Sequence, residues 1–153
     1  MEFKFTISGR IAKPVHEVFE AVADPARLSG YFTTGGAQGR LETGAVVTWD
    51  FHDFPGAFPV NVVEVVPDEK IVLTWGAAPD DDAGGPYETR VTMTFAQLDG
   101  DTRTLVSITE EGFRQTEAGL KSSYGNCEGW TGMLAAMKVY LEHGINLREG
   151  FYT

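Results

Sequence analysis

The polar residues that could carry chemistry occur in small groups, none of which is a complete catalytic or metal-binding set. His16 and Glu20 are one helical turn apart, a spacing that can hold a metal ion. No third ligand accompanies them, and metal sites use at least three protein ligands. His52 and Asp53 adjoin each other near an expected strand end, so their side chains point to opposite faces and do not converge on one substrate. We therefore expect no metal, no cofactor and no catalytic residue.

Glu110 and Glu111 form a different kind of pair because they fall within an apolar strand pattern. Adjacent strand residues point to opposite faces, so one of the two carboxylates is expected to point inward. Such a group is the best candidate for a polar anchor in an otherwise apolar site. Cys127 falls within an apolar helical pattern, where a buried and unreactive thiol is expected.

Aromatic and methionine side chains are the richer signal. Several share a strand face or a helix face, which core packing alone would explain. The alternative is an aromatic-lined pocket for a flat apolar ligand, with methionine supplying adaptable walls. The residues predicted to bind that ligand are Tyr31, Phe32, Trp49, Phe51, Trp75, Met93, Phe95, Trp130, Leu134 and Met137.

Length and composition limit the possible classes of protein. The 153 residues predict one domain spanning 1–153, and 42% apolar with 22% charged residues is typical of globular proteins. Twelve basic and twenty-two acidic residues give a net charge of −10 without a basic cluster, which argues against nucleic acid and anionic membranes as partners. No apolar run is long enough to span a membrane. The absence of a signal-peptide pattern and the single cysteine favour a cytoplasmic location.

The elements that must position these residues are mostly strands. Alternating apolar and polar residues predict a strand over 2–13, and a helix follows from Pro14. Asp24 is expected to cap a second short helix that runs to about Tyr31. Residues 33–44 are glycine-rich and predict a loop, whereas Asp80, Asp81 and Asp82 predict a solvated loop with at most weak calcium affinity. Further strands are predicted at 46–51, 58–66, 71–75, 87–98 and 104–111.

The C-terminal part predicts a long helix from near residue 120 to His143. Its apolar stripe consists of Leu120, Tyr124, Cys127, Trp130, Leu134, Met137 and Leu141. Another element or a second subunit is expected to pack on its stripe of small residues, Gly125, Gly129, Gly132 and Ala136. Strands joined by short turns predict an antiparallel sheet, and one long amphipathic helix must pack on it. The fold class is therefore α+β with two layers, an arrangement that can enclose a ligand cavity.

Four stretches together resemble the START-like (SRPBCC) superfamily. They are residues 11–19, residues 24–28 with Tyr31-Phe32, residues 109–113, and Gly129-Trp130 with Leu134. Within the superfamily, the chain is most similar to homologues of the C-terminal domain of the activator of the 90-kDa heat-shock protein ATPase. The resemblance implies a helix-grip fold with a curved antiparallel sheet of about six strands and two short helices after strand one. The long C-terminal helix would pack across the concave face.

The superfamily includes lipid carriers, plant hormone and allergen proteins, and aromatase/cyclases. The resemblance thus implies non-catalytic binding of a small hydrophobic or aromatic molecule in a cavity between the sheet and the long helix, by a monomer or a homodimer. Two alternatives stay open. One is a co-chaperone-like protein that acts through its surface, and the other is a cyclase- or dehydratase-like enzyme that uses the same cavity.

Overall fold

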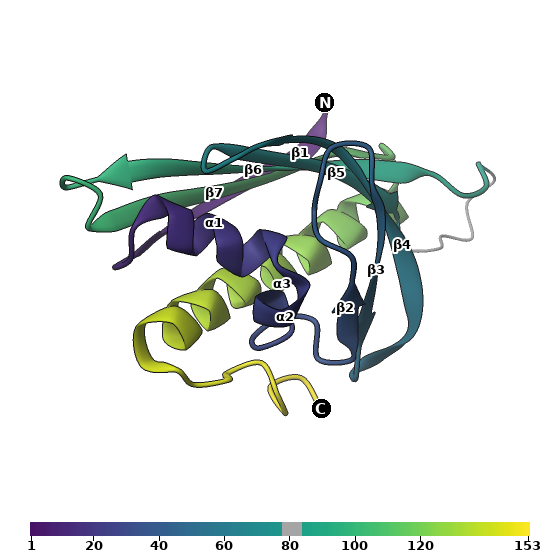
Figure 1. Cartoon of the computed structure of the whole chain (residues 1–153). Coiled ribbons are helices and arrows are strands. Elements are labelled where there is room, and N and C mark those ends of the chain that lie inside the picture. Colours follow the sequence, from purple (N-terminus) through teal and green to yellow (C-terminus); the bar gives the residue numbers. More distant parts are fainter. Residues whose placement is uncertain (78–83) are drawn as a thin grey trace.

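One curved antiparallel sheet forms the larger layer of the structure (Figure 1). The computed structural model describes residues 1–77 and 84–153, so Asp80, Asp81 and Asp82 lie outside the described residues. Within this part of the chain the strand order is β1-β7-β6-β5-β4-β3-β2. The strands are β1 (Phe3–Ile11), β2 (Gly36–Gln38), β3 (Val46–Phe51), β4 (Phe54–Val66), β5 (Lys70–Gly76), β6 (Glu88–Leu98) and β7 (Arg103–Phe113).

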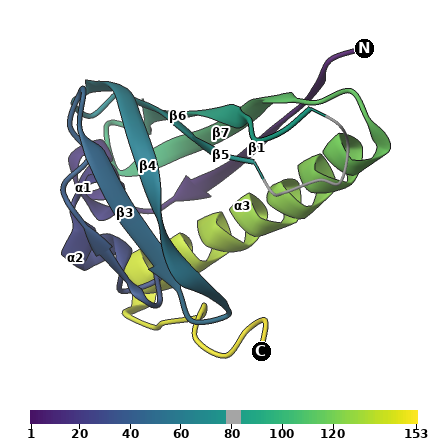
Figure 2. The same ribbon diagram turned by 90° about the vertical axis from the view of Figure 1, so that its right-hand side faces the viewer.

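Three helices lie on one face of this sheet. The short helices α1 (Val15–Ala23) and α2 (Pro25–Leu28) follow β1, and the long helix α3 (Glu117–His143) crosses beneath the strands (Figures 1 and 2). This arrangement confirms the predicted α+β class with a long C-terminal helix on a curved sheet. None of the helices in the described ranges combines the length and apolar character needed to cross a membrane.

Helix caps and turns at the ends of the elements follow from local sequence signals. Asp24 accepts a hydrogen bond from the backbone N–H of Ala26 and thereby caps α2 as predicted. The β6–β7 turn places Asp99, Gly100 and Asp101 at φ values of 54°, 66° and 63°, a left-handed run that Asp and Gly tolerate best. Asp101 also accepts a hydrogen bond from Val15 N at 2.8 Å, so the hairpin turn caps the start of α1.

The sheet has a strand that the sequence did not predict. Residues 36–38 of the expected loop form β2, which pairs antiparallel with β3 at the sheet edge, so the sheet has seven strands rather than about six. The three residues Gly-Ala-Gln are too few to show an alternating pattern, and β2 is defined by its backbone pairing with β3. β4 also begins at Phe54, earlier than the predicted residue 58.

The buried face of α3 differs from the predicted apolar stripe in its first half. Tyr124 is 67% exposed and Cys127 is half-buried, which corrects the expectation that both point inward. At this end the helix approaches the sheet through small or polar residues, so counting apolar residues selected the wrong face. The buried residues of α3 are Gly119, Ser123, Trp130, Met133, Leu134, Ala136 and Met137.

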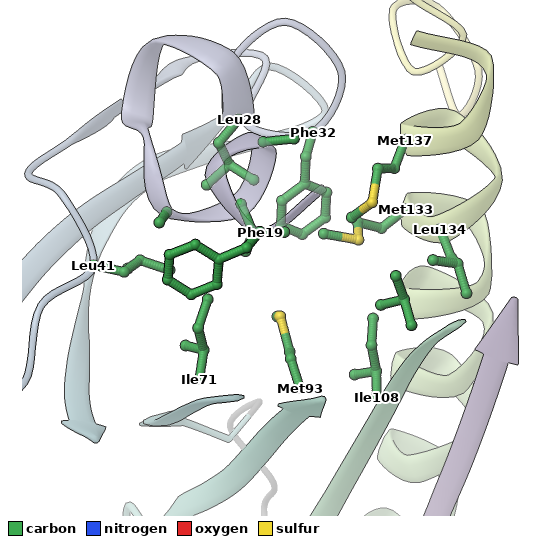
Figure 3. Close-up of a cluster of buried hydrophobic side chains, with 14 of the residues drawn as sticks. Phe19, Leu28, Phe32, Leu41, Ile71, Met93, Ile108, Met133, Leu134 and Met137 are labelled. Atoms are coloured by element: carbon green, nitrogen blue, oxygen red, sulfur yellow. The ribbon is translucent and has the colours of Figure 1, made fainter. Parts of the chain in front are cut away.

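The core lies between the helices and the sheet. Figure 3 shows Met133, Leu134 and Met137 reaching from α3 toward Ile108 and Met93 on the strands. Phe19 and Leu28 close this space from α1 and α2. Flexible methionine side chains suit such an irregular three-way contact.

Candidate functional site

Five of the predicted ligand-binding residues form one continuous aromatic cluster. Ring centroids lie 5.6 Å apart for Phe32 and Trp130, 5.3 Å for Trp75 and Trp130, and 4.9 Å for Phe32 and Phe51. Trp49 contacts Phe32 at 5.6 Å and Trp75 at 5.9 Å. These separations are those of interacting aromatic pairs. The aromatic cluster therefore joins β3, β5, α3 and the segment after α2.

Phe58 is a sixth member of the aromatic cluster that the sequence analysis missed. Its ring centroid lies 6.0 Å from that of Phe51 and 5.9 Å from that of Trp75. Phe58 and Trp75 are half-buried, whereas the other four rings are buried. The aromatic cluster thus reaches the protein surface along β4 and β5. Phe58 lies opposite Trp49 in the pairing of β3 with β4. A prediction of the register between these two strands would therefore have placed Phe58 next to Trp49.

A buried carboxylate lies beside this cluster. Glu110 is fully buried, and its Oε1 accepts a hydrogen bond from Trp130 Nε1 at 2.9 Å. Its Oε2 accepts from Trp75 Nε1 at 2.9 Å and from Thr89 Oγ1 at 2.6 Å. Asn126 Nδ2 lies 3.1 Å from both oxygens. Two indoles, a hydroxyl and an amide therefore hold one carboxylate between β5, β6, β7 and α3.

The strand alternation explains why Glu110 points inward. In β7 the alternate positions Thr104, Val106, Ile108 and Glu110 are all buried, whereas Glu111 is half-buried. Thr89 likewise begins the inward-facing series of β6. Asn126 lies one helical turn before Trp130, so both side chains share a face of α3. Sequence reasoning identified Glu110 or Glu111 as a polar anchor, but Thr89 and Asn126 gave no signal that distinguishes them from other polar residues.

Trp49 contributes a polar atom of another kind to the aromatic cluster. Its side chain is 1% exposed, and its Nε1 has no hydrogen-bond partner among the described residues. An indole N–H is a donor that is normally paired when buried. Leaving such a donor unpaired costs about 1–3 kcal/mol. Of the three indoles in the aromatic cluster, two therefore donate to Glu110 and that of Trp49 has no acceptor among the described residues.

The other five predicted ligand-binding residues lie outside the aromatic cluster. Met93 and Met137 belong to the methionine-rich core, and the ring of Phe95 contacts that of Phe19 edge-on, with 5.6 Å between their centroids.

Tyr31 packs against Tyr140, and its hydroxyl donates a hydrogen bond to the carbonyl of Ala21. Burial raises the pKa of Tyr31 well above its ordinary value. Leu134 packs against Gly9 of β1, where a Cβ would lie 2.8 Å from Leu134 Cδ2.

The C-terminal tail covers the Phe51 end of the aromatic cluster. Arg148 donates two hydrogen bonds to Asp53, at 2.8 and 2.9 Å, and the two side chains are 12% and 14% exposed. The guanidinium also lies over the rings of Phe51 and Tyr152, at 5.4 and 4.7 Å from the centroids. The tail thus connects the end of α3 to the β3–β4 turn.

Two grooves lie on the surface of the described part of the chain, and neither is lined by a predicted ligand-binding residue. One lies beside α1, where His16 pairs with Asp68 at 2.9 Å. In the same groove Arg40 makes a bidentate contact with Glu20 and lowers the pKa of that carboxyl. His16 and Glu20 therefore have separate partners.

The second groove lies between the exposed face of α3 and the tail residues Phe151 and Tyr152.

His52 and Asp53 also turn to different partners. His52 Nδ1 lies 3.4 Å from Glu149 Oε1, while Asp53 binds Arg148. Among the described residues, no three His, Cys, Asp or Glu side chains lie together in a way that would hold a metal ion. The aromatic cluster with Glu110 is thus the part of the chain where apolar surface and convergent polar atoms coincide.

A curved antiparallel sheet with a long C-terminal helix across it, and an interior rich in aromatic side chains, defines a START-like protein of the helix-grip class. The family described as "Activator of Hsp90 ATPase homolog 1-like protein" matches residues 12–142. The chain belongs to this family. A search of curated proteins found no match.

Solved structures support the same classification. The protein SSP2350 from Staphylococcus saprophyticus is 28% identical, with a TM-score of 0.77 over 95% of this chain and 96% of that one. DynU16, a protein in the dynemicin biosynthetic locus, is 25% identical with a TM-score of 0.75, over 95% of this chain and 49% of that one. The Aha1 dimer from Colwellia psychrerythraea is 16% identical with a TM-score of 0.71, over 93% of this chain and 98% of that one. This last likeness concerns the fold alone.

Proposed function

We propose that the chain binds a small, flat, apolar molecule at the aromatic cluster, without catalysing a reaction on it. The family and fold support a ligand-binding or co-chaperone-like role. The aromatic cluster offers large apolar faces, which suit stacking against another planar group. Because its rings contact one another, a ligand would stack on the outer rings, Phe58 and Trp75, or separate them from the inner ones.

The unpaired indole N–H of Trp49 carries this proposal. A buried donor without a partner destabilises the folded chain, and a ligand that supplies an acceptor would offset that destabilisation. The donor belongs to the aromatic cluster rather than to an isolated site, so one planar molecule could contact the rings and accept the hydrogen bond together. Few polar atoms in an apolar surround are what small-molecule sites generally present.

Replacing Trp49 by Phe tests this assignment, because it keeps an aromatic ring and removes the N–H. We expect Trp49→Phe to bind planar compounds that carry an acceptor at least about tenfold more weakly, as for the loss of one hydrogen bond of ~1.4 kcal/mol. Phe19→Leu, a change in the core away from the aromatic cluster, is the control and should leave affinity unchanged. Titration calorimetry measures both. Equal affinity for wild type and Trp49→Phe would remove the observation on which the proposal rests.

A co-chaperone-like role is the second candidate, because the family is described by activation of the Hsp90 ATPase. It requires a surface rather than an interior site. Tyr124, Phe151 and Tyr152 are large exposed side chains around the groove on α3 and supply such a surface. Binding of purified Hsp90 that is lost in Tyr124→Ser, together with no binding of planar compounds, would favour this role over the first.

A further inference from the structure

The hydrogen bond from Asn126 to Glu110 differs from the others in length and in the number of oxygens that it contacts. Trp75, Trp130 and Thr89 each donate to a single carboxylate oxygen at 2.6–2.9 Å. Asn126 instead shares its amide between the two oxygens at 3.1 Å each. Longer and shared hydrogen bonds are weaker than short and well-aligned ones. Asn126 is therefore the donor that Glu110 loses most easily.

Asn126 is also placed where a ligand could reach the carboxylate. Thr89 and Trp130 are buried, but Asn126 and Trp75 are half-buried. Trp75 is one of the two rings through which the aromatic cluster reaches the surface. Trp75 Nε1 and Asn126 Nδ2 lie 2.9 and 3.1 Å from the same oxygen, Glu110 Oε2, so a molecule stacked on Trp75 would lie near the amide of Asn126.

The hydrogen-bond partners of Glu110 are all neutral donors. None of the ion pairs among the described residues includes Glu110, although its side chain is fully buried. A buried carboxylate is stabilised most by a cation or another strong donor, because charge-assisted hydrogen bonds are about twice as strong as neutral ones. The net charge of −10 adds a long-range attraction for cations.

We propose that the molecule bound at the aromatic cluster carries an N–H or O–H donor, and that this group replaces Asn126 on the Glu110 carboxylate. The ligand class is then a planar apolar body that carries one donor group, either an ammonium or a hydroxyl, together with an oxygen atom that can accept the N–H of Trp49. This inference rests on the proposed function, because it names the ligand class of the same site. It adds a selectivity that stacking alone would not produce.

Four probes with one ring system separate the contributions of stacking and of the donor group. They are (methoxynaphthyl)methylamine, naphthol, methoxynaphthalene and naphthoate, each of which has an oxygen acceptor for Trp49, titrated calorimetrically into the 153-residue chain. We expect the amine and the naphthol to bind at least about tenfold more tightly than methoxynaphthalene, and naphthoate to bind most weakly. The amine and the naphthol together distinguish a cationic ligand from a neutral donor.

The outcomes separate the two proposals. Equal affinity for methoxynaphthalene and for the two donor compounds would overturn the ligand class and leave the apolar site standing. Tighter binding of naphthoate would also overturn it. A failure of all four probes to bind would overturn the proposed function and this inference together.

Asn126→Ala tests the displacement itself and leaves three donors on Glu110. We expect it to tighten binding of the amine about three- to tenfold, because no amide must then be displaced, and to leave methoxynaphthalene unchanged. The matched control is Asn61→Ala, because Asn61 donates to Glu88 at 2.9 Å in an exposed pair. Unchanged or weaker amine binding in Asn126→Ala, with Asn61→Ala like wild type, would overturn the displacement.

Discussion

Trp130 donates its indole N–H to Glu110 across 2.9 Å, and this contact connects the middle of α3 to β7 inside the protein. Trp75 makes the equivalent contact from β5 to the other carboxylate oxygen. One side chain thus fixes the position of the long helix relative to two strands. The same carboxylate determines how the two indoles face the rest of the aromatic cluster.

Removing this carboxylate should strongly destabilise the fold. We expect Glu110→Ala to lower the free energy of unfolding by about 3–5 kcal/mol, because the variant leaves four donors without their acceptor. Urea denaturation followed by circular dichroism measures the change. The neighbouring variant Glu111→Gln should change stability by less than about 1 kcal/mol. Similar effects of the two substitutions would show that the hydrogen bonds to Glu110 contribute little.

The glycines of α3 should respond oppositely to alanine. A Cβ on Gly119 would lie 1.9 Å from the backbone oxygen of Arg114, so Gly119→Ala should destabilise by about 3 kcal/mol. Gly125 and Gly129 have open space around them, and alanine there should stabilise by about 0.5–1 kcal/mol through helix propensity. Thermal denaturation of the three variants distinguishes these signs. Loss of stability in Gly125→Ala would indicate a packing partner on that face.

The predicted small-residue stripe on α3 is covered in part. The chain's own tail packs at Gly132, where a Cβ would lie 2.6 Å from Tyr152 Oη, and Ala136 is buried. A Cβ on Gly125 or Gly129 would meet no atom of another described element within 4 Å. The expectation of a packed element thus holds for one end of the stripe.

The contact between Arg148 and Asp53 should make stability depend on pH. Hydrogen bonds from Arg148 lower the pKa of Asp53 below its ordinary value of 3.8. A lowered pKa in the folded state means that the stabilisation is present above the ordinary pKa and is lost as the pH falls through the lowered one. We expect Asp53→Asn to be about 1–2 kcal/mol less stable than wild type at neutral pH, with the difference shrinking toward acidic pH.

The exposed pair of Arg103 and Asp99 provides the control for this experiment. Their atoms lie 2.6 Å apart, but the side chains are 42% and 59% exposed. Asp99→Asn should therefore change stability by less than about 0.5 kcal/mol at any pH. A difference between wild type and Asp53→Asn that stays constant with pH would contradict an ionised Asp53 as the source.

Sequence patterns predicted most of the fold because alternation and helical spacing persist through long elements. The strands β1, β3, β6 and β7 and the helix α3 appear close to their expected positions. β2 was missed because three residues at a sheet edge have too little length for a pattern. Tyr124 was assigned to the wrong face because the buried residues in this part of the helix are Gly119 and Ser123, which a search for an apolar stripe does not select.

The candidate site was predicted less completely. Phe32, Trp49, Phe51, Trp75 and Trp130 come together, since they share faces that must meet between helix and sheet. Which aromatic residues belong to one cluster depends on strand order and register, and a single sequence does not contain these directly. The hydrogen bonds of Glu110 to Thr89 and Asn126 depend on the same register. The ligand-binding role of all these residues stays a prediction.

The three tryptophans permit a direct test of ligand binding at the aromatic cluster. The chain contains only Trp49, Trp75 and Trp130, so its NMR spectrum should show three indole N–H resonances. Single Trp→Phe variants assign them. Before ligand is added, the proton of Trp49 should resonate upfield of the other two, because Trp75 and Trp130 donate to Glu110 whereas Trp49 has no partner among the described residues.

Titration with naphthol, while these three resonances are followed, shows directly whether the ligand binds at the aromatic cluster. We expect the Trp49 resonance to move downfield as its N–H gains an acceptor, and the Trp75 resonance to move as the ring system stacks on it. Both should saturate at the same naphthol concentration. Three unmoved indole resonances, at a concentration where calorimetry detects binding, would place the ligand elsewhere and exclude the aromatic cluster as its binding site.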